Sequence, residues 1–315
     1  MVMIHEVFDI GNLRIAFRRV EASHGMPGVD GVSIAAFRHR LDENLYALSA
    51  ELGDGRYTPL PLLRFLVAKP DGSPRGLCVP CVRDRVAQAA VLNLVEPIFE
   101  AQFEDASFAY RRGRSVRQAA RRIKELRDRG YKYVVEADID SFFDNVDHGL
   151  LLGKVGRLIY DPCVVRIIRD WVKAEVYDGE KVYVLDKGIC QGSVISPVLA
   201  NLFLDEFDEA ILARGHKLVR YSDDFIVLAK SRTEAGNALS CIEEVLAHLC
   251  LALDPGDTHV TDFEKGFKYL GLLFVGGSIF APFDRPPREK RVLYMPPPFD
   301  ITGYLAARRS RSAGE

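Results

Sequence analysis

Two adjacent carboxylates in a tight turn constrain this chain more than any other feature. The sequence Tyr221-Ser222-Asp223-Asp224 lies between two short apolar segments, residues 216–220 and 225–229. Short, partly β-branched segments joined by polar turn residues predict a β-hairpin. Neighbouring carboxylates at its tip repel each other, and a bound divalent cation would offset that repulsion. The turn is therefore a candidate metal site, although Asp also favours turns for local reasons.

A second acidic strand end is expected if this hairpin holds catalytic metal ions, because two-metal sites take carboxylates from separate segments. Residues 131–140 provide it, with a β-branched and aromatic run that ends in Asp138 and Asp140. Residues 142–148 then predict a turn into a helix. We predict that the two strand ends meet at one pair of cations.

The composition predicts a large core, because 48% of the 315 residues are hydrophobic and 27% are charged. No apolar run reaches spanning length and the N-terminus does not resemble a signal peptide, so we expect a cytoplasmic protein without membrane contact. The six cysteines show no framework pattern and fit a reducing compartment. Cys78-x-x-Cys81 lacks a second pair at zinc spacing.

Local charge indicates nucleic-acid binding, although the net charge is only −2. Nine Lys or Arg residues lie between Arg111 and Arg129, and residues 308–311 add a smaller basic cluster. Basic stripes can contact phosphates even when the total charge is near zero. A solvated helix face is the alternative interpretation of the first stripe.

Hydrophobic periodicity predicts alternating helices and strands. Helices are expected over residues 8–21, 33–52, 84–96, 115–130, 164–174, 196–214 and 233–251, with Ser196 as an N-cap before Pro197. Strands are expected over residues 62–68, 76–79, 131–140, 176–184 (a hairpin), 216–229 (the acidic hairpin), 258–263 and 267–274, and weak secondary structure from residue 276. This order predicts an α+β core, a mostly antiparallel sheet with helices on one face.

A series of short motifs runs in order through residues 10–275. They are Gly25-x-Pro27-Gly28-Val29-Asp30-Gly31, Lys69-Pro70-Asp71-Gly72 with Arg75, Asp84-Arg85-x-x-Gln88, Phe108-x-Tyr110-Arg111-x-Gly113-Arg114-Ser115, Ala137-Asp138-Ile139-Asp140-Ser141-Phe142-Phe143-Asp144, Gln191-Gly192-Ser193-x-x-Ser196-Pro197-x-x-Ala200-Asn201, Tyr221-Ser222-Asp223-Asp224 and Tyr269-Leu270-Gly271. Together these motifs resemble the reverse transcriptases of the bacterial, group II intron-like lineage.

The resemblance implies a right-hand polymerase fold with fingers, an antiparallel palm sheet and a thumb that is reduced or absent. It places fingers with an N-terminal extension at residues 1–102 and further fingers at 149–190. The palm would comprise residues 103–148 and 191–275. Residues 276–315 would be a Pro/Arg-rich tail, or a linker to a thumb or an integrase.

The resemblance also implies roles for individual residues. Asp138, Asp223 and Asp224 would be catalytic and, with the Ile139 carbonyl, would hold two Mg²⁺, for which Mn²⁺ can substitute. The nucleotide-binding residues would be Lys69, Arg75, Phe143 (which excludes a 2′-hydroxyl), Gln191 and Gly192. Template or primer contacts would come from Arg111, Arg112, Arg114, Tyr221, Tyr269, Leu270 and Gly271. Asp140, Asp144 and Asp147 are expected to be structural, and Asp257 stands where relatives often carry a Lys that protonates pyrophosphate.

The implied activity is RNA-directed DNA synthesis, in which dNTPs are added to a DNA or RNA primer on an RNA template. Residues 291–295 also resemble the junction to the spacer integrase in CRISPR-associated reverse transcriptases. That resemblance implies integrase subunits as partners and a role in spacer acquisition from RNA, in antiviral defence. Two alternatives stay open: another palm-fold nucleotidyl transferase (template-independent or RNA-synthesising), and a non-catalytic nucleic-acid-binding subunit of a CRISPR adaptation complex.

Overall fold

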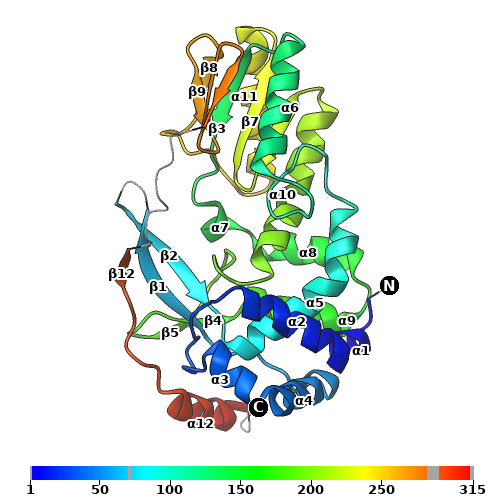
Figure 1. Cartoon of the computed structure of the whole chain (residues 1–315), viewed down its shortest axis with the longest axis vertical. Coiled ribbons are helices and arrows are strands. Elements are labelled where there is room, and N and C mark those ends of the chain that lie inside the picture. The colour runs from blue at the N-terminus through cyan, green and yellow to red at the C-terminus, as the bar shows by residue number, and fades with distance from the viewer. Residues whose placement is uncertain (1, 70–71, 282–290, 313–315) are drawn as a thin grey trace.

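The computed structural model describes residues 2–69, 72–281 and 291–312. Figure 1 shows a four-stranded sheet with its helices in the upper part and a five-stranded sheet with the remaining helices below. The strands of the four-stranded sheet, in spatial order, are β6 (Lys217–Tyr221), β7 (Asp224–Ala229), β3 (Tyr133–Ala137) and β8 (His259–Asp262). All neighbouring pairs in it are antiparallel, as the sequence predicts.

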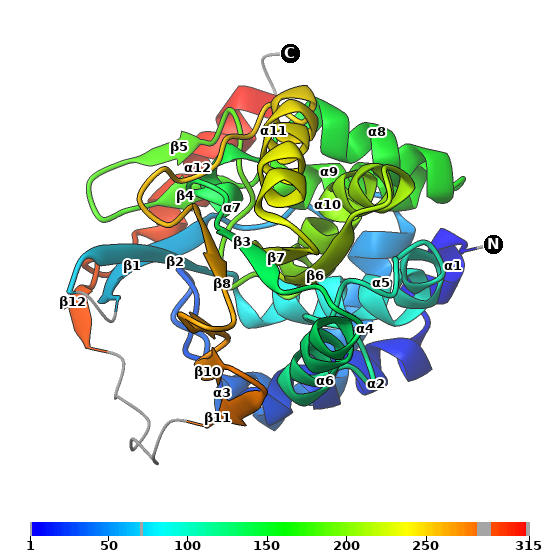
Figure 2. The same cartoon turned by 90° about the horizontal axis from the view of Figure 1, so that it is seen from above.

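Both faces of the four-stranded sheet are covered. Helices α10 (Ser196–Ala213) and α11 (Arg232–His248) lie on one face and α6 (Val116–Asp128) on the other (Figure 2). Side chains alternate along β7: Phe225 and Val227 belong to the core under α10 and α11, whereas Ile226 and Leu228 pack with α6. The prediction of helices on one face is therefore wrong, because β7 is apolar on both sides and each side needs a cover.

A small three-stranded sheet continues the cover formed by α6. It consists of β9 (Phe267–Tyr269), β10 (Leu272–Val275) and β11 (Ser278–Phe280). The single strand predicted over residues 267–274 is instead a hairpin, because Leu270 and Gly271 have φ of 53° and 75°. Phe267 and Phe274 stack at 5.0 Å and pack against α6 and the four-stranded sheet.

The five-stranded sheet is built around the hairpin of β1 (Leu62–Ala68) and β2 (Pro74–Val79). Strand β4 (Glu175–Tyr177) runs parallel to the start of β1 and forms a hairpin with β5 (Val182–Val184), as the sequence predicts. Strand β12 (Val292–Tyr294) pairs with the other end of β1. The remaining helices are α1 (Ile4–Val7), α2 (Ile10–Ala22), α3 (Ile34–His39), α4 (Leu41–Gly53), α5 (Val82–Glu100), α7 (Phe142–Asn145), α8 (His148–Leu158), α9 (Pro162–Val172) and α12 (Ile301–Ser312).

Several predicted helix boundaries are wrong where packing overrides local signals. Helix α5 passes through Pro97 instead of ending before it, because neighbouring helices bury α5 along most of its length, including Phe99 beyond the proline. The helix predicted from residue 33 to 52 breaks at Arg40 into α3 and α4. Ser196 is the first residue of α10, and Ile195 occupies the N-cap without a side-chain cap.

The prediction of weak secondary structure from residue 276 onward is also wrong. The described part of this segment forms β11, β12 and α12. The side chains of β12 are exposed, and its backbone pairs with the distant strand β1. Within the described ranges, no helix is both long and apolar enough to cross a membrane.

Candidate active site

The acidic hairpin has a two-residue turn. Strands β6 and β7 pair up to Tyr221 and Asp224, and Ser222 and Asp223 form the connection. Ser222 has a φ of 65°, in the left-handed region that tight hairpin turns use. The turn holds Asp223 and Asp224 at one end of the four-stranded sheet.

The register of β3 against β7 brings Asp138 to the same end. Ala137 pairs with Phe225 in this antiparallel ladder, so the next residue pair along it is Asp138 and Asp224. Beyond the ladder, the Asp138 carbonyl accepts a hydrogen bond from Asp254 N–H (2.9 Å), and the Asp140 N–H donates to the Ala252 carbonyl (2.9 Å). The strand register thus brings Asp138 to the same end of the sheet as Asp223 and Asp224, from two distant segments of the chain.

The three carboxylates interact electrostatically. The pKa of Asp138 is raised to about 7, mainly by burial and to a smaller extent by the charges of Asp223 and Asp224. The pKa of Asp224 is raised to about 6. Reduced hydration is the largest cause and the charge of Asp223 is the second, although the Asp224 side chain still reaches solvent. Arg75 opposes this rise in the pKa of Asp224, so its guanidinium lies close enough to act on the acidic cluster.

Asp257 adds further negative charge beside this cluster. Its carboxylate contributes to the raised pKa values of Asp138, Asp224 and Glu136. His259 Nε2 lies 3.5 Å from the Glu136 carboxylate and is solvent-exposed. The chemistry of the donor set suits a hard divalent cation. Across the residues that the structure describes, however, no three or more His, Cys, Asp or Glu side chains are already gathered as metal ligands.

A buried ion pair between Arg220 and Asp208 supports the backbone of the acidic turn. Arg220 is fully buried, and its Nε donates to the fully buried carboxylate of Asp208 at 2.7 Å. Its Nη1 donates to the Asn201 amide oxygen (3.0 Å) and to the Ser222 carbonyl (2.9 Å). Sequence reasoning missed Arg220 and Asp208, although an Arg inside an otherwise apolar strand was an available signal.

Tyr269 braces the same hairpin. Its hydroxyl lies 3.1 Å from the carbonyls of both Val219 and Asp224, and its ring is buried. The predicted primer contact at Tyr269 is therefore not supported, since its hydroxyl faces the hairpin backbone. Leu270 is half-buried and Gly271 is exposed at the β9–β10 turn, and Tyr221 is half-buried at the end of β6.

The predicted nucleotide-binding residues lie on the β1–β2 hairpin and the loop before α10. Lys69 and Arg75 are exposed on that hairpin, and Pro70 and Asp71 of the predicted motif fall outside the described residues. The Gln191 carbonyl accepts a hydrogen bond from Cys78 N–H of β2 (2.7 Å). Gly192 has a φ of 112°, and a Cβ there would collide with the Cys78 carbonyl. The glycine is thus required for packing against β2.

Phe143 lies in α7, directly after the first acidic strand end. Its ring meets that of Phe142 edge-on at 5.2 Å, and both side chains are buried. Phe142 packs further against Phe203 of α10, so its predicted place in the core agrees with the structure. Among the acidic residues expected to be structural, Asp147 caps α8 by accepting from Leu150 N–H (2.8 Å). Asp140 accepts from the Ser141 hydroxyl, and Asp144 is exposed.

The basic stripe of residues 111–129 divides into buried and exposed members. Arg111 is buried and donates to Glu100 and to the carbonyls of Phe103, Glu104 and Ser107, so its predicted template contact is wrong. Arg112 and Arg114 pair with Glu96 and Asp105. Within the described part of the chain, exposed members without an ion-pair partner are Arg117, Arg121 and Arg129.

Comparison with known proteins agrees with this arrangement. The family model for reverse transcriptase (RNA-dependent DNA polymerase) matches residues 67–274. Protein YkfC of Escherichia coli K12 is 33% identical over 284 residues, which cover 78% of this chain and 74% of YkfC. The group II intron-encoded protein LtrA of Lactococcus lactis is 34% identical over 186 residues, which cover 59% of this chain.

The matched lengths differ between relatives. The match covers only 31% of LtrA, so this chain spans about a third of that protein. In a solved Cas6-RT-Cas1–Cas2 complex, one chain is similar with 28% sequence identity and a TM-score of 0.47, over 77% of this chain and 41% of that one. From the family match, which covers more than half of its length, the chain belongs to the reverse transcriptase family.

Proposed function

We propose that the chain is an RNA-directed DNA polymerase that adds dNTPs to the 3′-hydroxyl of a DNA or RNA primer on an RNA template in the cytoplasm. The observation that carries the proposal is the meeting of Asp138 with Asp223 and Asp224 at one end of an antiparallel sheet. In this account residues 103–148 and 191–275, which include the four-stranded sheet with α6, α10 and α11, would be the palm, and residues 1–102 and 149–190, which include β1, β2, β4 and β5, would be the fingers.

The carboxylates of Asp138, Asp223 and Asp224, with the Ile139 carbonyl, would hold two Mg²⁺ or Mn²⁺ ions. The raised pKa values of Asp138 and Asp224 reflect burial first and then repulsion from the neighbouring carboxylates, and a bound cation would offset both. When bound, the ions would supply charge neutralisation at the primer 3′-oxygen and at the leaving pyrophosphate. Ile139 N–H already donates to Asp138 (2.9 Å) and so orients that carboxylate.

The hairpin of β1 and β2 would bind the triphosphate. Arg75 acts electrostatically on Asp224, so its guanidinium is placed to contact phosphates beside the carboxylates. Lys69, exposed at the end of β1, would add a second positive charge. Gln191 and Gly192 would support the templating pair through their contact with β2, and Phe143 would exclude a 2′-hydroxyl.

Cation binding should depend on pH. The folded-state pKa values of Asp138 and Asp224 exceed their unfolded values near 4. Between about pH 4 and about pH 7 the native state therefore binds more protons than the unfolded state. Without metal, these groups therefore stabilise the fold less as the pH rises through that window. Because protons and Mg²⁺ compete, we expect Mg²⁺ to raise the melting temperature clearly at about pH 8 and little at about pH 5.5.

Differential scanning fluorimetry at constant ionic strength measures this effect. The matched variant Asp138→Asn should melt higher than wild type without Mg²⁺ at about pH 8 and should lose most of the Mg²⁺-dependent rise. A Mg²⁺ shift of equal size at both pH values, or one that persists in Asp138→Asn, would contradict the proposed cation site.

Sugar selectivity provides a test of Phe143. Replacing it with Ala removes the aromatic face next to the first acidic strand end, and we expect discrimination against ribonucleotides to fall by about 10- to 100-fold. The measurement compares kcat/KM for dCTP and CTP on one primer–template. Phe280→Ala, at a Phe that is 51% exposed on β11, is the control and should leave the ratio unchanged. An unchanged ratio in Phe143→Ala would assign Phe143 to the core alone.

The polymerase proposal itself is tested by extension of a labelled DNA primer on an RNA template with dNTPs and Mg²⁺. The expected product ends at the 5′ end of the template, and each step requires the complementary dNTP. Extension that does not depend on a template would favour the nucleotidyl transferase alternative. RNA binding by a folded wild type that extends no primer would favour the non-catalytic alternative.

For the biological role, we propose spacer acquisition with CRISPR integrase subunits, from the resemblance of residues 291–295 to an integrase junction. Residues 292–294 form β12 of the five-stranded sheet, so a partner would meet an ordered strand there. Stable co-purification with a spacer integrase encoded beside this gene is the expected result. A gene without such a neighbour would contradict this role and leave the polymerase proposal intact.

A further inference from the structure

Strand β12 completes the outer half of the β1–β2 hairpin. In the described structure β4 pairs with β1 only at residues 62–63. Beyond residue 63, β2 pairs with one edge of β1, and β4 no longer covers the other edge. On the other edge, residues 66–67 pair with residues 292–294, and Ala68 N–H donates to the Arg291 carbonyl at 2.9 Å. An isolated two-stranded hairpin is marginally stable in water, and a third strand strengthens it. Figure 1 shows β12 beside β1.

Burial of side chains does not hold β12 in place. Val292, Leu293 and Tyr294 are 48%, 43% and 40% exposed. A short strand with exposed side chains gains little from its backbone hydrogen bonds, because these replace bonds to water. Its position therefore depends on an anchor elsewhere in the same segment.

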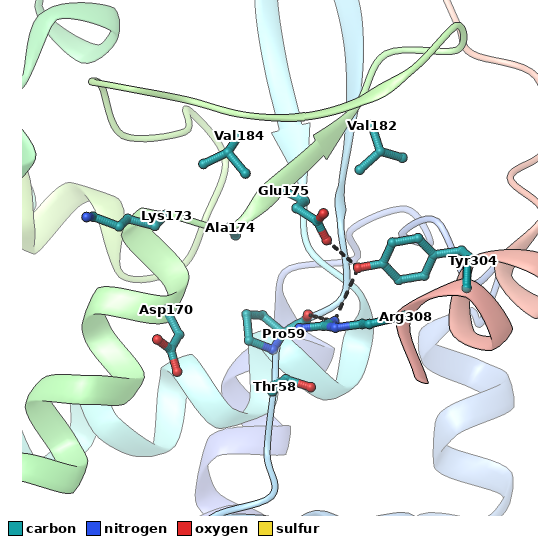
Figure 3. Close-up of a pocket in the computed structure, with 11 residues that line it drawn as sticks. Thr58, Pro59, Asp170, Lys173, Ala174, Glu175, Val182, Val184, Tyr304 and Arg308 are labelled. Carbon is teal, nitrogen blue, oxygen red and sulfur yellow. Dashed lines mark hydrogen bonds between the residues drawn. The ribbon is translucent and has the colours of Figure 1, made fainter. Parts of the chain in front are cut away.

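Helix α12 provides that anchor (Figure 3). The Tyr304 hydroxyl donates to the Glu175 carboxylate of β4. Arg308 Nη1 donates to the Pro59 carbonyl (3.1 Å) and to the Tyr304 hydroxyl (3.2 Å). These groups border a cavity of about 700 Å³ that separates α12 from α9 and β5. Because this cavity replaces close apolar packing, the polar contacts of Tyr304 and Arg308 account for much of the docking.

A stiff segment joins the anchor to β12. Residues 296–298 are three consecutive prolines, which favour an extended, semi-rigid conformation. The Tyr177 hydroxyl donates to the Pro297 carbonyl (3.4 Å), and the Phe299 ring packs against Tyr177 at 4.7 Å. Docking of α12 thus holds β12 at a high effective concentration beside the edge of β1.

We infer that residues 291–308, here called the strap, position the β1–β2 hairpin for the incoming nucleotide, with Tyr304 and Glu175 as positioning residues. The inference rests on the proposed polymerase function. The hairpin carries Lys69 at the end of β1, and Arg75 pairs with Val67 of β1, where β12 binds the opposite edge. Release of the strap leaves the catalytic carboxylates in place and loosens the residues that contact the triphosphate.

The kinetic test replaces Tyr304 with Ala. We expect the KM for dNTP to rise about five- to tenfold while kcat stays within about twofold, because only nucleotide positioning is weakened. Glu175→Ala should give the same pattern, and Glu175→Gln should stay close to wild type, since an amide oxygen still accepts the hydrogen bond from Tyr304. Tyr160→Ala, at a Tyr that is 75% exposed, is the matched control and should change neither constant.

Hydrogen exchange provides a readout that does not require activity. In Tyr304→Ala, backbone amides of residues 64–68 should exchange faster, while those of β6 and β7 keep their wild-type rates. If Tyr304→Ala is active with an unchanged KM for dNTP, or if its exchange at residues 64–68 is unchanged, the proposed role of the strap is wrong. A wild type that extends no primer would contradict the polymerase proposal instead, and the exchange rates would still decide whether the strap supports the hairpin.

Discussion

Replacing Asp223 with Asn is expected to reduce the rate of primer extension at least about a thousandfold. The substitution keeps the shape of the side chain and removes one negative charge from the cluster with Asp138 and Asp224. A site with less negative charge holds divalent cations more weakly and neutralises the reacting oxygens less well. The rate is measured in a single turnover, with enzyme in excess over a labelled primer–template.

Asp138→Asn should show the same loss, and the double variant should be little worse than either single one, because the carboxylates act as one unit. Asp186→Asn is the matched control, since Asp186 is an exposed carboxylate that is not among the groups that raise the pKa of Asp138 or Asp224. Both site variants should fold and melt no lower than wild type without metal. An Asp223→Asn enzyme that keeps more than about a tenth of the wild-type rate would remove Asp223 from the catalytic site.

Replacing Arg220 with Met is expected to lower the free energy of unfolding by about 3–5 kcal/mol. The change leaves the fully buried Asp208 carboxylate without its cation and removes the donor to the Ser222 carbonyl. Burial already raises the pKa of Asp208 even with the guanidinium present, which shows how costly its charge is there. Urea unfolding followed by circular dichroism measures the effect.

Two comparisons isolate the cause. Arg112→Met breaks an ion pair with Glu96 at an arginine whose side chain is 76% exposed, and it should change the free energy of unfolding by less than about 1 kcal/mol. Arg220→Met combined with Asp208→Leu should recover much of the lost stability, because no unpaired buried charge remains. Equal losses in Arg220→Met and Arg112→Met would refute the role of the buried pair.

Local patterns were sufficient to predict the acidic hairpin, the first acidic strand and the β4–β5 hairpin. Each depends on alternation and turn residues within a short stretch of chain. The meeting of Asp138 with Asp223 and Asp224 was predictable only from the expectation that a metal site needs both. The register of β3 and β7 then places Asp138 beside Asp224.

Features set by distant partners could not be predicted from local patterns. Arg111 lies in a basic stripe, yet a pocket of carbonyls and Glu100 takes up its donors. Helix α5 continues through Pro97 because other helices surround it. Strand β12 has exposed side chains and pairs with the distant strand β1, so no local alternation of buried and exposed residues marks it. In each case the deciding contact lies far away in the sequence.

Iron-mediated backbone cleavage tests most directly whether two distant segments form one cation site. Fe²⁺ bound in place of Mg²⁺ reduces added hydrogen peroxide to hydroxide and hydroxyl radicals, and these radicals cut the chain near the ion. We predict cuts both next to Asp138 and next to Asp223, competed away by excess Mg²⁺ and absent from Asp223→Asn. Cleavage at only one of these segments, or cleavage at both that persists in Asp223→Asn, would contradict the shared site.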